Sequence, residues 1–211
     1  MKNRFWLLIS LVLIFAVASC ATTTLTKVWK DPNFGTGTIK KMMVVGIAKD
    51  PATRRLFEDT FAQSLAAHGV NVIKSYEAIT LEGLNNTKGA TEKIRSLGAG
   101  AVLATRLINK ETVETYYPPR YDYAPMGAYG RWDGYYGMGY SSMMDPGYIV
   151  SEQVAKLETT IYDIKTGQLV WSALSDTWLD EAAQDRLISD FICVMVKRMT
   201  KDGLIPAAEK K

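Results

Sequence analysis

The sequence predicts an α/β fold: a mixed sheet with three parallel strands in the order β-α-β-α-β, extended by an antiparallel hairpin and followed by a C-terminal helix. Three observations predict it. Apolar runs of strand length alternate with helical segments in the first half, two-residue alternation flanks a turn in the second half, and the last segment has acids at its start and bases at its end. Strands that are joined through helices pair in parallel by right-handed crossovers.

The parallel part of the sheet is expected within residues 42–108. Met42 to Ala48 is apolar throughout, which is typical of a strand covered on both faces. Asp50-Pro51 then begins a helix, with an N-cap acceptor and a proline at the first helical position, and Gly69 ends it. Weaker copies of this unit follow as strand 70–73, helix 91–97 ended by Gly98, and strand 101–108.

The antiparallel hairpin is expected at residues 150–164 and 169–177. One face of its first strand carries Ala155, Leu157, Thr159 and Ile161, and the other face is polar. Asp163 can bond the backbone ahead of it and Gly167 permits a positive φ, which predicts the turn. The last helix is expected at about 184–200, with Gly203 as its stop. Its apolar stretch 191–196 indicates either burial between the sheet and the N-terminal segment or contact with a partner.

The N-terminus predicts export and a lipid anchor. Two basic residues precede a run of apolar residues from Phe5 to Val17 that is too short to span a bilayer as a helix, which is typical of a secretion signal. Val17-Ala18-Ser19-Cys20 resembles the lipobox of bacterial lipoproteins, and this resemblance implies that Cys20 becomes the acylated first residue. Ordinary cleavage after Ala18 is the alternative. Several acyl chains on one residue form a stable membrane anchor. Ala21, where an Asp would retain a lipoprotein in the inner membrane, implies the outer membrane, facing the periplasm.

We therefore expect a signal peptide at 1–19, a tether at 20–41 with one short candidate strand at 25–29, a single α/β domain at 42–205 and a tail at 206–211. Without Lys2 and Arg4, 23 of the 25 basic residues remain against 22 acidic ones. This near-neutral balance argues against nucleic-acid binding. With Cys20 acylated, Cys193 is the remaining thiol, and we expect it to be buried in the last helix.

Residues 116–148 form an unusual insertion between two expected strands. The segment holds nine Tyr and six Gly but no Leu, Ile or Val, so it cannot build a core of its own. A connection this long inside a domain is either functional or disordered. One interpretation is a mobile tip without a role, and the other is a binding arm, because aromatic faces suit stacking on sugars or docking on proteins. The candidate contact residues are Tyr116, Tyr117, Tyr121, Tyr123, Tyr129, Trp132, Tyr135, Tyr136 and Tyr140.

Motifs for catalysis are missing from the sequence. It contains no G-x-S-x-G, H-E-x-x-H, C-x-x-C or Walker pattern, and its one histidine, His68, is expected to be structural. The loop 49–55 follows the first core strand, where open α/β sheets bind ligands, and its arginines could hold an anion. Asp50 is nevertheless explained as a helix cap. We predict a protein that is not an enzyme and that has no catalytic residue, cofactor or metal.

Several segments of the mature chain resemble a family of bacterial outer-membrane lipoproteins that has no assigned activity. They are Val28-Trp-Lys-Asp-Pro32, Met42 to Ala48, Phe57-Glu58, Gly98 to Val102, and Tyr162-Asp-Ile-Lys-Thr-Gly-Gln-Leu-Val-Trp-Ser172. The order of elements resembles, more weakly, the TolB amino-terminal and CsgG-like lipoprotein domains. These resemblances imply a periplasmic binding or assembly module whose partner is a periplasmic protein or peptidoglycan. The alternative is a subunit of an oligomeric envelope secretion or assembly complex, a homo-oligomer included.

Overall fold

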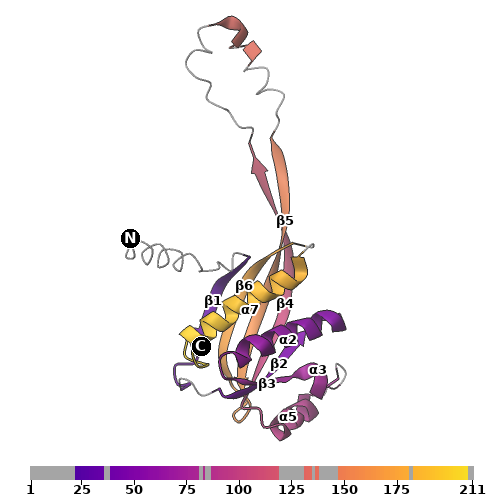
Figure 1. Ribbon diagram of the computed structural model, residues 1–211, viewed down its shortest axis with the longest axis vertical. Coiled ribbons are helices and arrows are strands. Elements are labelled where there is room, and N and C mark those ends of the chain that lie inside the picture. Colours follow the sequence, from indigo (N-terminus) through magenta and orange to yellow (C-terminus); the bar gives the residue numbers. More distant parts are fainter. Residues whose placement is uncertain are drawn as a thin grey trace, which may run out of the picture. The chain divides into compact units, whose positions relative to one another are not determined.

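A computed structural model describes residues 22–35, 39–80, 83, 87–118, 131–134, 136–137, 147–180 and 183–208. Its strands form one six-stranded sheet in the order β1-β6-β5-β4-β2-β3 (Figure 1). The elements are β1 Thr23–Lys30, β2 Lys41–Ile47, α2 Pro51–Ala66, β3 Asn71–Lys74, α3 Ser75–Ala78, α5 Thr87–Ser96, β4 Ala101–Tyr117, β5 Tyr148–Asp163, β6 Leu169–Leu179 and α7 Gln184–Lys201. The chain divides into two compact units, unit 1 (Met1–Lys110 and Ala155–Lys211) and unit 2 (Glu111–Val154).

The sheet combines parallel and antiparallel pairs, which confirms the predicted fold class. β2 pairs in parallel with both β3 and β4, so that Met42 lies opposite Val72 on one side and Ala101 on the other. The hydroxyls of Thr105 and Thr159 lie 3.0 Å apart, which places β5 beside β4. β6 follows through a tight turn, and β1 pairs antiparallel with it at the edge of the sheet.

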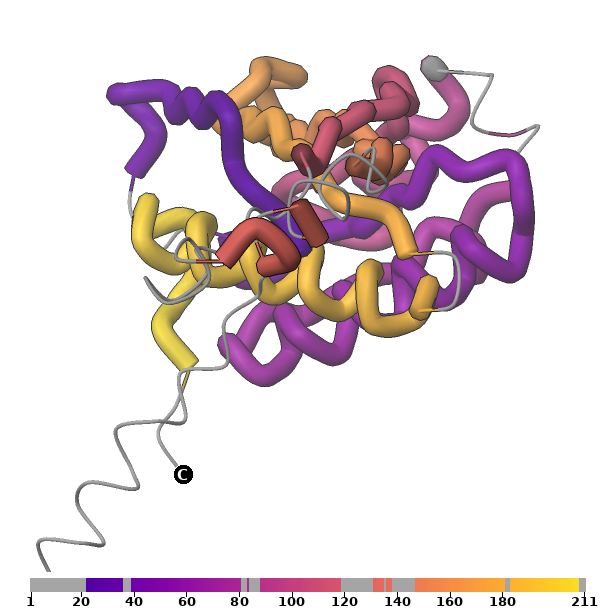
Figure 2. Tube along the Cα trace, turned by 90° about the horizontal axis from the view of Figure 1, so that it is seen from above, coloured from indigo at the N-terminus to yellow at the C-terminus, as the bar shows by residue number. Residues whose placement is uncertain are grey.

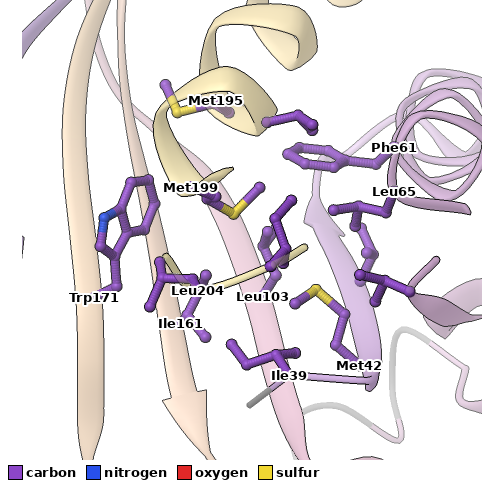
Figure 3. Close-up of a cluster of buried hydrophobic side chains, with 14 of the residues drawn as sticks. Ile39, Met42, Phe61, Leu65, Leu103, Ile161, Trp171, Met195, Met199 and Leu204 are labelled. Atoms are coloured by element: carbon purple, nitrogen blue, oxygen red, sulfur yellow. The ribbon is translucent and has the colours of Figure 1, made fainter. Parts of the chain in front are cut away.

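Helices cover both faces of β2, which explains its unbroken apolar sequence. Met42 and Val44 point into the larger core with Phe61 of α2, whereas Met43 and Val45 belong to a second cluster with Ile94 of α5. Figure 2 shows α7 (yellow) and α2 (purple) together on one side of the sheet. Figure 3 shows side chains from α2, α7 and four strands meeting in the larger core.

The apolar stretch of α7 is buried inside unit 1. Phe191, Ile192 and Met195 are at most 2% exposed, and the helix packs on α2, β1 and β6. The expectation of burial against the sheet and the N-terminal segment is therefore correct. Cys193 is half-buried, not fully buried as expected.

The N-terminal segment is more ordered than a tether. Thr23–Lys30 is strand β1, and the Thr23 and Thr177 hydroxyls lie 2.9 Å apart across the β1–β6 pair. After the strand, the Asp31 amide donates to the Val170 carbonyl at 3.0 Å, and Ile39 is buried in the core. The short strand expected at 25–29 is the one part of this order that the sequence predicts. The segment 1–19 expected as a signal peptide, Cys20 and residues 209–211 lie outside the described residues.

Local sequence signals set the turns as expected. Asp163 Oδ1 accepts hydrogen bonds from the Lys165 and Thr166 amides, at 2.6 and 3.0 Å, between β5 and β6. Gly167 closes the turn with φ +72°, a value that side chains disfavour. The N-cap of α2 is also confirmed, because Asp50 Oδ2 accepts from the Thr53 amide at 2.8 Å. Among the described helices, none is both long enough and apolar enough to span a bilayer.

Candidate binding surface

Unit 2 contains the aromatic segment, and its described aromatic side chains are exposed. Strands β4 and β5 continue into this unit as a two-stranded ribbon. Tyr116 is 57% exposed, Tyr148 62% and Trp132 75%. Exposed aromatic surface of this extent is typical of interaction sites, because monomeric proteins avoid large apolar patches. We call the exposed set of Tyr116, Tyr117, Trp132, Tyr136 and Tyr148 the aromatic arm.

The aromatic arm has ordered ring pairs. Tyr117 of β4 and Tyr148 of β5 stack across the ribbon, with ring centroids 5.3 Å apart and planes inclined by 14°. Trp132 and Tyr136 form a second pair with centroids 5.7 Å apart. Stacked cross-strand aromatics stabilise a β pair by up to about 1 kcal/mol. The strand ends thus present flat, preorganised aromatic faces.

Gly147 makes the Tyr117–Tyr148 pair possible. Its φ is +74°, and a Cβ at this position would lie 2.5 Å from the Tyr117 carbonyl oxygen and 2.7 Å from the Tyr116 hydroxyl. Any side chain here would push the two strand ends apart. Gly137, in contrast, would place a Cβ in open space.

The structure places four of the nine candidate contact residues in unit 2. Tyr116, Tyr117, Trp132 and Tyr136 are all exposed, and it adds Tyr148, which the sequence analysis did not single out. Tyr148 could have been found from its place at the start of the returning strand. The other candidates, Tyr121, Tyr123, Tyr129, Tyr135 and Tyr140, lie outside the described residues.

A buried ionic cluster lies where β2 ends against α2 and α3. Arg54 and Glu58 are 4% and 0% exposed, and Arg54 Nε donates to Glu58 Oε1 at 3.0 Å. The same oxygen accepts from the Gly46 amide at 3.0 Å and from the Ser75 hydroxyl at 2.6 Å. Oε2 accepts from the Tyr76 amide at 2.9 Å. Four hydrogen bonds occupy the acceptor sites of this carboxylate, so the cluster holds α2 to β2 and α3.

This cluster was not among the features expected from the sequence. The sequence indicates Arg54 and Arg55 only as possible anion ligands. A signal was available, because Arg54 and Glu58 are four residues apart and share a helix face with Phe61 and Leu65. The structure turns Arg54 inward, whereas the guanidinium of Arg55 lies 5.5 Å from the ring centre of Tyr76.

The start of α2 therefore has few free hydrogen-bond donors or positive charges with which to bind an anion. Asp50 Oδ2 also accepts from the Thr53 hydroxyl, at 2.6 Å. This bond and those from the Thr53 and Ala52 amides hold the pKa of the Asp50 carboxyl below its ordinary value. A negative charge already occupies this helix end, and Arg54 is bound to Glu58.

Two other features are His68, which has a structural role, and a groove on the surface of unit 1. His68 is half-buried, and its Nδ1 lies 2.9 Å from the Ser64 carbonyl oxygen, as in a helix-terminal contact. A shallow groove of about 280 Å³ runs between β1 and α7. Its lining offers apolar and cationic contacts, and consists of Leu25, Val194, Lys197, Arg198 and Lys201. In the described part of the chain, no His, Cys, Asp or Glu side chains gather as a metal site.

A charged cluster on the surface is centred on Lys74 of β3. Its Nζ lies 2.6 Å from Glu77 Oε1 and 3.1 Å from Asp59 Oδ1, which raise the pKa of Lys74. The Tyr76 hydroxyl donates to Asp59 Oδ1 at 2.7 Å. This bond first, and Lys74 after it, lower the pKa of the Asp59 carboxyl.

The lowered pKa of Asp59 predicts a pH-dependent contribution to stability. Its charged form is favoured in the folded state, so its contribution is present above the unfolded pKa of about 3.9 and is lost as pH falls through the folded pKa. Because the side chain is 49% exposed, Asp59→Asn should cost under about 1 kcal/mol at neutral pH. Urea unfolding should show the difference in stability between the two proteins shrinking as the pH falls below the unfolded pKa of Asp59. A gap of unchanged size in acid would contradict this assignment.

Comparisons with known proteins give likeness of structure only. No family model matches the chain, and no curated protein matches it. Similar solved structures include a PelC dodecamer from Paraburkholderia phytofirmans, with 17% identity, a TM-score of 0.46, and coverage of 86% of this chain and 97% of that one. Lipoprotein GNA1162 from Neisseria meningitidis has 13% identity, a TM-score of 0.40, and coverage of 76% and 98%.

A third similar structure is a PDZ domain protein from Parabacteroides distasonis. It has 12% identity and a TM-score of 0.43, and the match covers 89% of this chain but 38% of that one. At such low identities and TM-scores, none of these likenesses extends to function.

Proposed function

We propose that this protein is a lipid-anchored, non-enzymatic module of the bacterial outer membrane, which faces the periplasm and binds a partner through the aromatic arm. The lipobox-like sequence ending at Cys20 supports the anchor. The observation that carries the binding role is the exposed, stacked pair of Tyr117 and Tyr148 on the ribbon. Tyr rings bury a large area at a small loss of side-chain freedom, so they suit a contact surface.

The charge of unit 2 limits the classes of partner that it can bind. Residues 111–154 contain two arginines and six carboxylates, which are Glu111, Glu114, Asp122, Asp133, Asp145 and Glu152. This negative balance disfavours anionic surfaces and leaves aromatic contact as the main attraction. A glycan, or a neutral to basic protein surface, fits these properties best. An isolated two-stranded ribbon is also marginally stable in water, so a partner that covers it would stabilise it.

The aromatic arm should lose its partner when its rings are removed. We expect Tyr117→Ala together with Tyr148→Ala to reduce recovery of the partner at least tenfold, in pull-down of envelope proteins and of purified peptidoglycan by the acylated protein. Gly147→Ala should weaken binding too, because it forces the strand ends apart while every ring remains. Gly137→Ala is the matched control and should bind normally, since it adds a methyl group in open space. Unchanged recovery with the double variant would overturn this role.

The alternative function, a subunit of an oligomeric complex, was suggested by the apolar stretch of α7. The apolar stretch of α7 is covered by α2 and the sheet, so it no longer needs a partner copy. Measuring the size of the detergent-extracted protein distinguishes the two functions, because a strict monomer excludes a homo-oligomeric assembly subunit.

A further inference from the structure

Exposed apolar side chains lie at one edge of the sheet in unit 1, the edge at which strands end and not the one formed by the outer strand β1. β2, β4 and β6 run in the same direction, and β1 runs against β6, so the ends of β2 and β6, the last unit 1 residues of β4 and the start of β1 lie toward the same edge of the sheet; β4 itself continues into unit 2. We call it the carboxyl edge. It carries Ile47 at the end of β2, Leu107 and Ile108 in β4, and Trp178 near the end of β6; these side chains are 56%, 44%, 48% and 39% exposed.

The anchor residue is tied to this edge by a very short piece of chain. The Trp178 amide donates to the Thr22 carbonyl at 2.9 Å, and β1 begins at Thr23. Cys20 precedes Thr22 by two residues, and an extended chain spans at most about 3.6 Å per residue. An acyl group on Cys20 therefore holds the Thr22 backbone, and Trp178 with it, within about 7 Å of the residue that enters the bilayer.

Side chains at the carboxyl edge match a lipid–water interface. Tryptophan concentrates at the headgroup level of membranes because its ring is apolar and its N–H is polar. Exposed cations lie beside the apolar residues, with Lys49 near Ile47 and Lys110 after Ile108. Arg106 is exposed as well, but its Nε donates to Glu158 Oε2 at 2.7 Å. Long basic side chains can extend from apolar surface to phosphate groups. Acidic residues are present as well, but Asp50 is committed to capping α2.

We infer that the β1–β6 part of the carboxyl edge rests on the surface of the membrane, with Trp178 in the headgroup layer. This inference depends on the proposed acylation of Cys20 and adds an orientation for unit 1. The occupant is the lipid surface because the anchor leaves too little chain for a partner protein to separate Trp178 from the bilayer. The expected 22-residue tether would have left room for one, but β1 begins at Thr23, three residues after Cys20.

Tryptophan quenching by brominated lipid tests this orientation. The acylated full-length mature protein carrying Trp132→Phe is reconstituted into phosphatidylethanolamine–phosphatidylcholine vesicles, with bromine near the headgroup end of the acyl chains. Its tryptophan emission should fall relative to vesicles without bromine. Adding Trp178→Phe should abolish most of that quenching. Adding Trp29→Phe is the matched control: Trp29 is 47% exposed but lies toward the other end of β1, so the quenching should persist.

Each outcome decides a separate question. Equal quenching in the Trp178→Phe and Trp29→Phe proteins, or no quenching in protein that floats with the vesicles, overturns the orientation. An unquenched Trp178 that cross-links to another protein overturns it in favour of a protein contact. Protein that fails to float is not acylated, which contradicts the proposed function instead. Far-ultraviolet circular dichroism of each variant confirms that the fold is retained, and Trp178→Tyr provides a second, more conservative replacement if Trp178→Phe does not fold.

Discussion

Replacing Glu58 with alanine should lower the free energy of unfolding by about 3–5 kcal/mol, because it leaves the Arg54 guanidinium buried without its counter-charge. The Gly46 and Tyr76 amides would also lose their acceptor. For a chain of this size, such a change should lower the melting temperature by on the order of 10 °C. Urea and thermal unfolding of the purified protein measure both quantities.

Asp59, the next residue of α2, provides the matched control for Glu58. It also forms an ion pair, with Lys74 at 3.1 Å, but its side chain is half exposed. Asp59→Ala should therefore cost less than about 1 kcal/mol. The double variant Arg54→Met with Glu58→Leu removes both buried charges, and it should be more stable than Glu58→Ala alone. Equal losses for Glu58→Ala and Asp59→Ala would contradict the role of the cluster as a buried clamp.

Trp171 should have a comparable effect on stability through packing. Its ring is fully buried in the larger core beside Met199 and Ile161, and its Nε1 donates to Asp202 Oδ2 at 2.9 Å (Figure 3). Trp171→Ala should cost about 3–5 kcal/mol, because it opens a large cavity between the sheet and α7. Trp171→Phe retains most of the bulk and should cost less, mainly the lost hydrogen bond to a carboxylate, about 1.5–3 kcal/mol. Chemical denaturation compares the two proteins.

Trp29 is the control for Trp171, because it is the same residue type on the neighbouring strand but is 47% exposed. Trp29→Ala should change stability by no more than about 0.5 kcal/mol. A loss as large as that of Trp171→Ala would show that a partner or a second copy covers this face of the sheet in solution.

The parts of the fold that depend on local patterns could be predicted from the sequence. The turn between β5 and β6 follows from Asp163 and Gly167, whose hydrogen bonds and backbone angle involve only neighbouring residues. The apolar run of β2 required cover on both faces, and α2 with α5 provides it. Such features do not need the positions of distant residues to be known.

Features that depend on distant contacts could not be predicted. Strand β1 looks polar in isolation, and it becomes a strand of the sheet because residues 171–177 of β6 lie beside it. Arg54 seemed a surface residue, yet its burial depends on Ser75, which lies 21 residues away along the chain. Composition alone located the aromatic arm, but the Tyr117–Tyr148 stack depends on pairing between two strand ends that 30 residues separate. For these features, sequence spacing gives no direct measure of proximity.

Strand β1 has a consequence for biogenesis. Its Thr23 meets Thr177 across 154 positions of sequence, so β1 cannot pair in the sheet until nearly the whole polypeptide is available. Until β6 has been synthesised, residues 23–30 have no strand to pair with. Docking of β1 against β6 is therefore a late step of folding, and it brings the start of the described chain against the strand formed last.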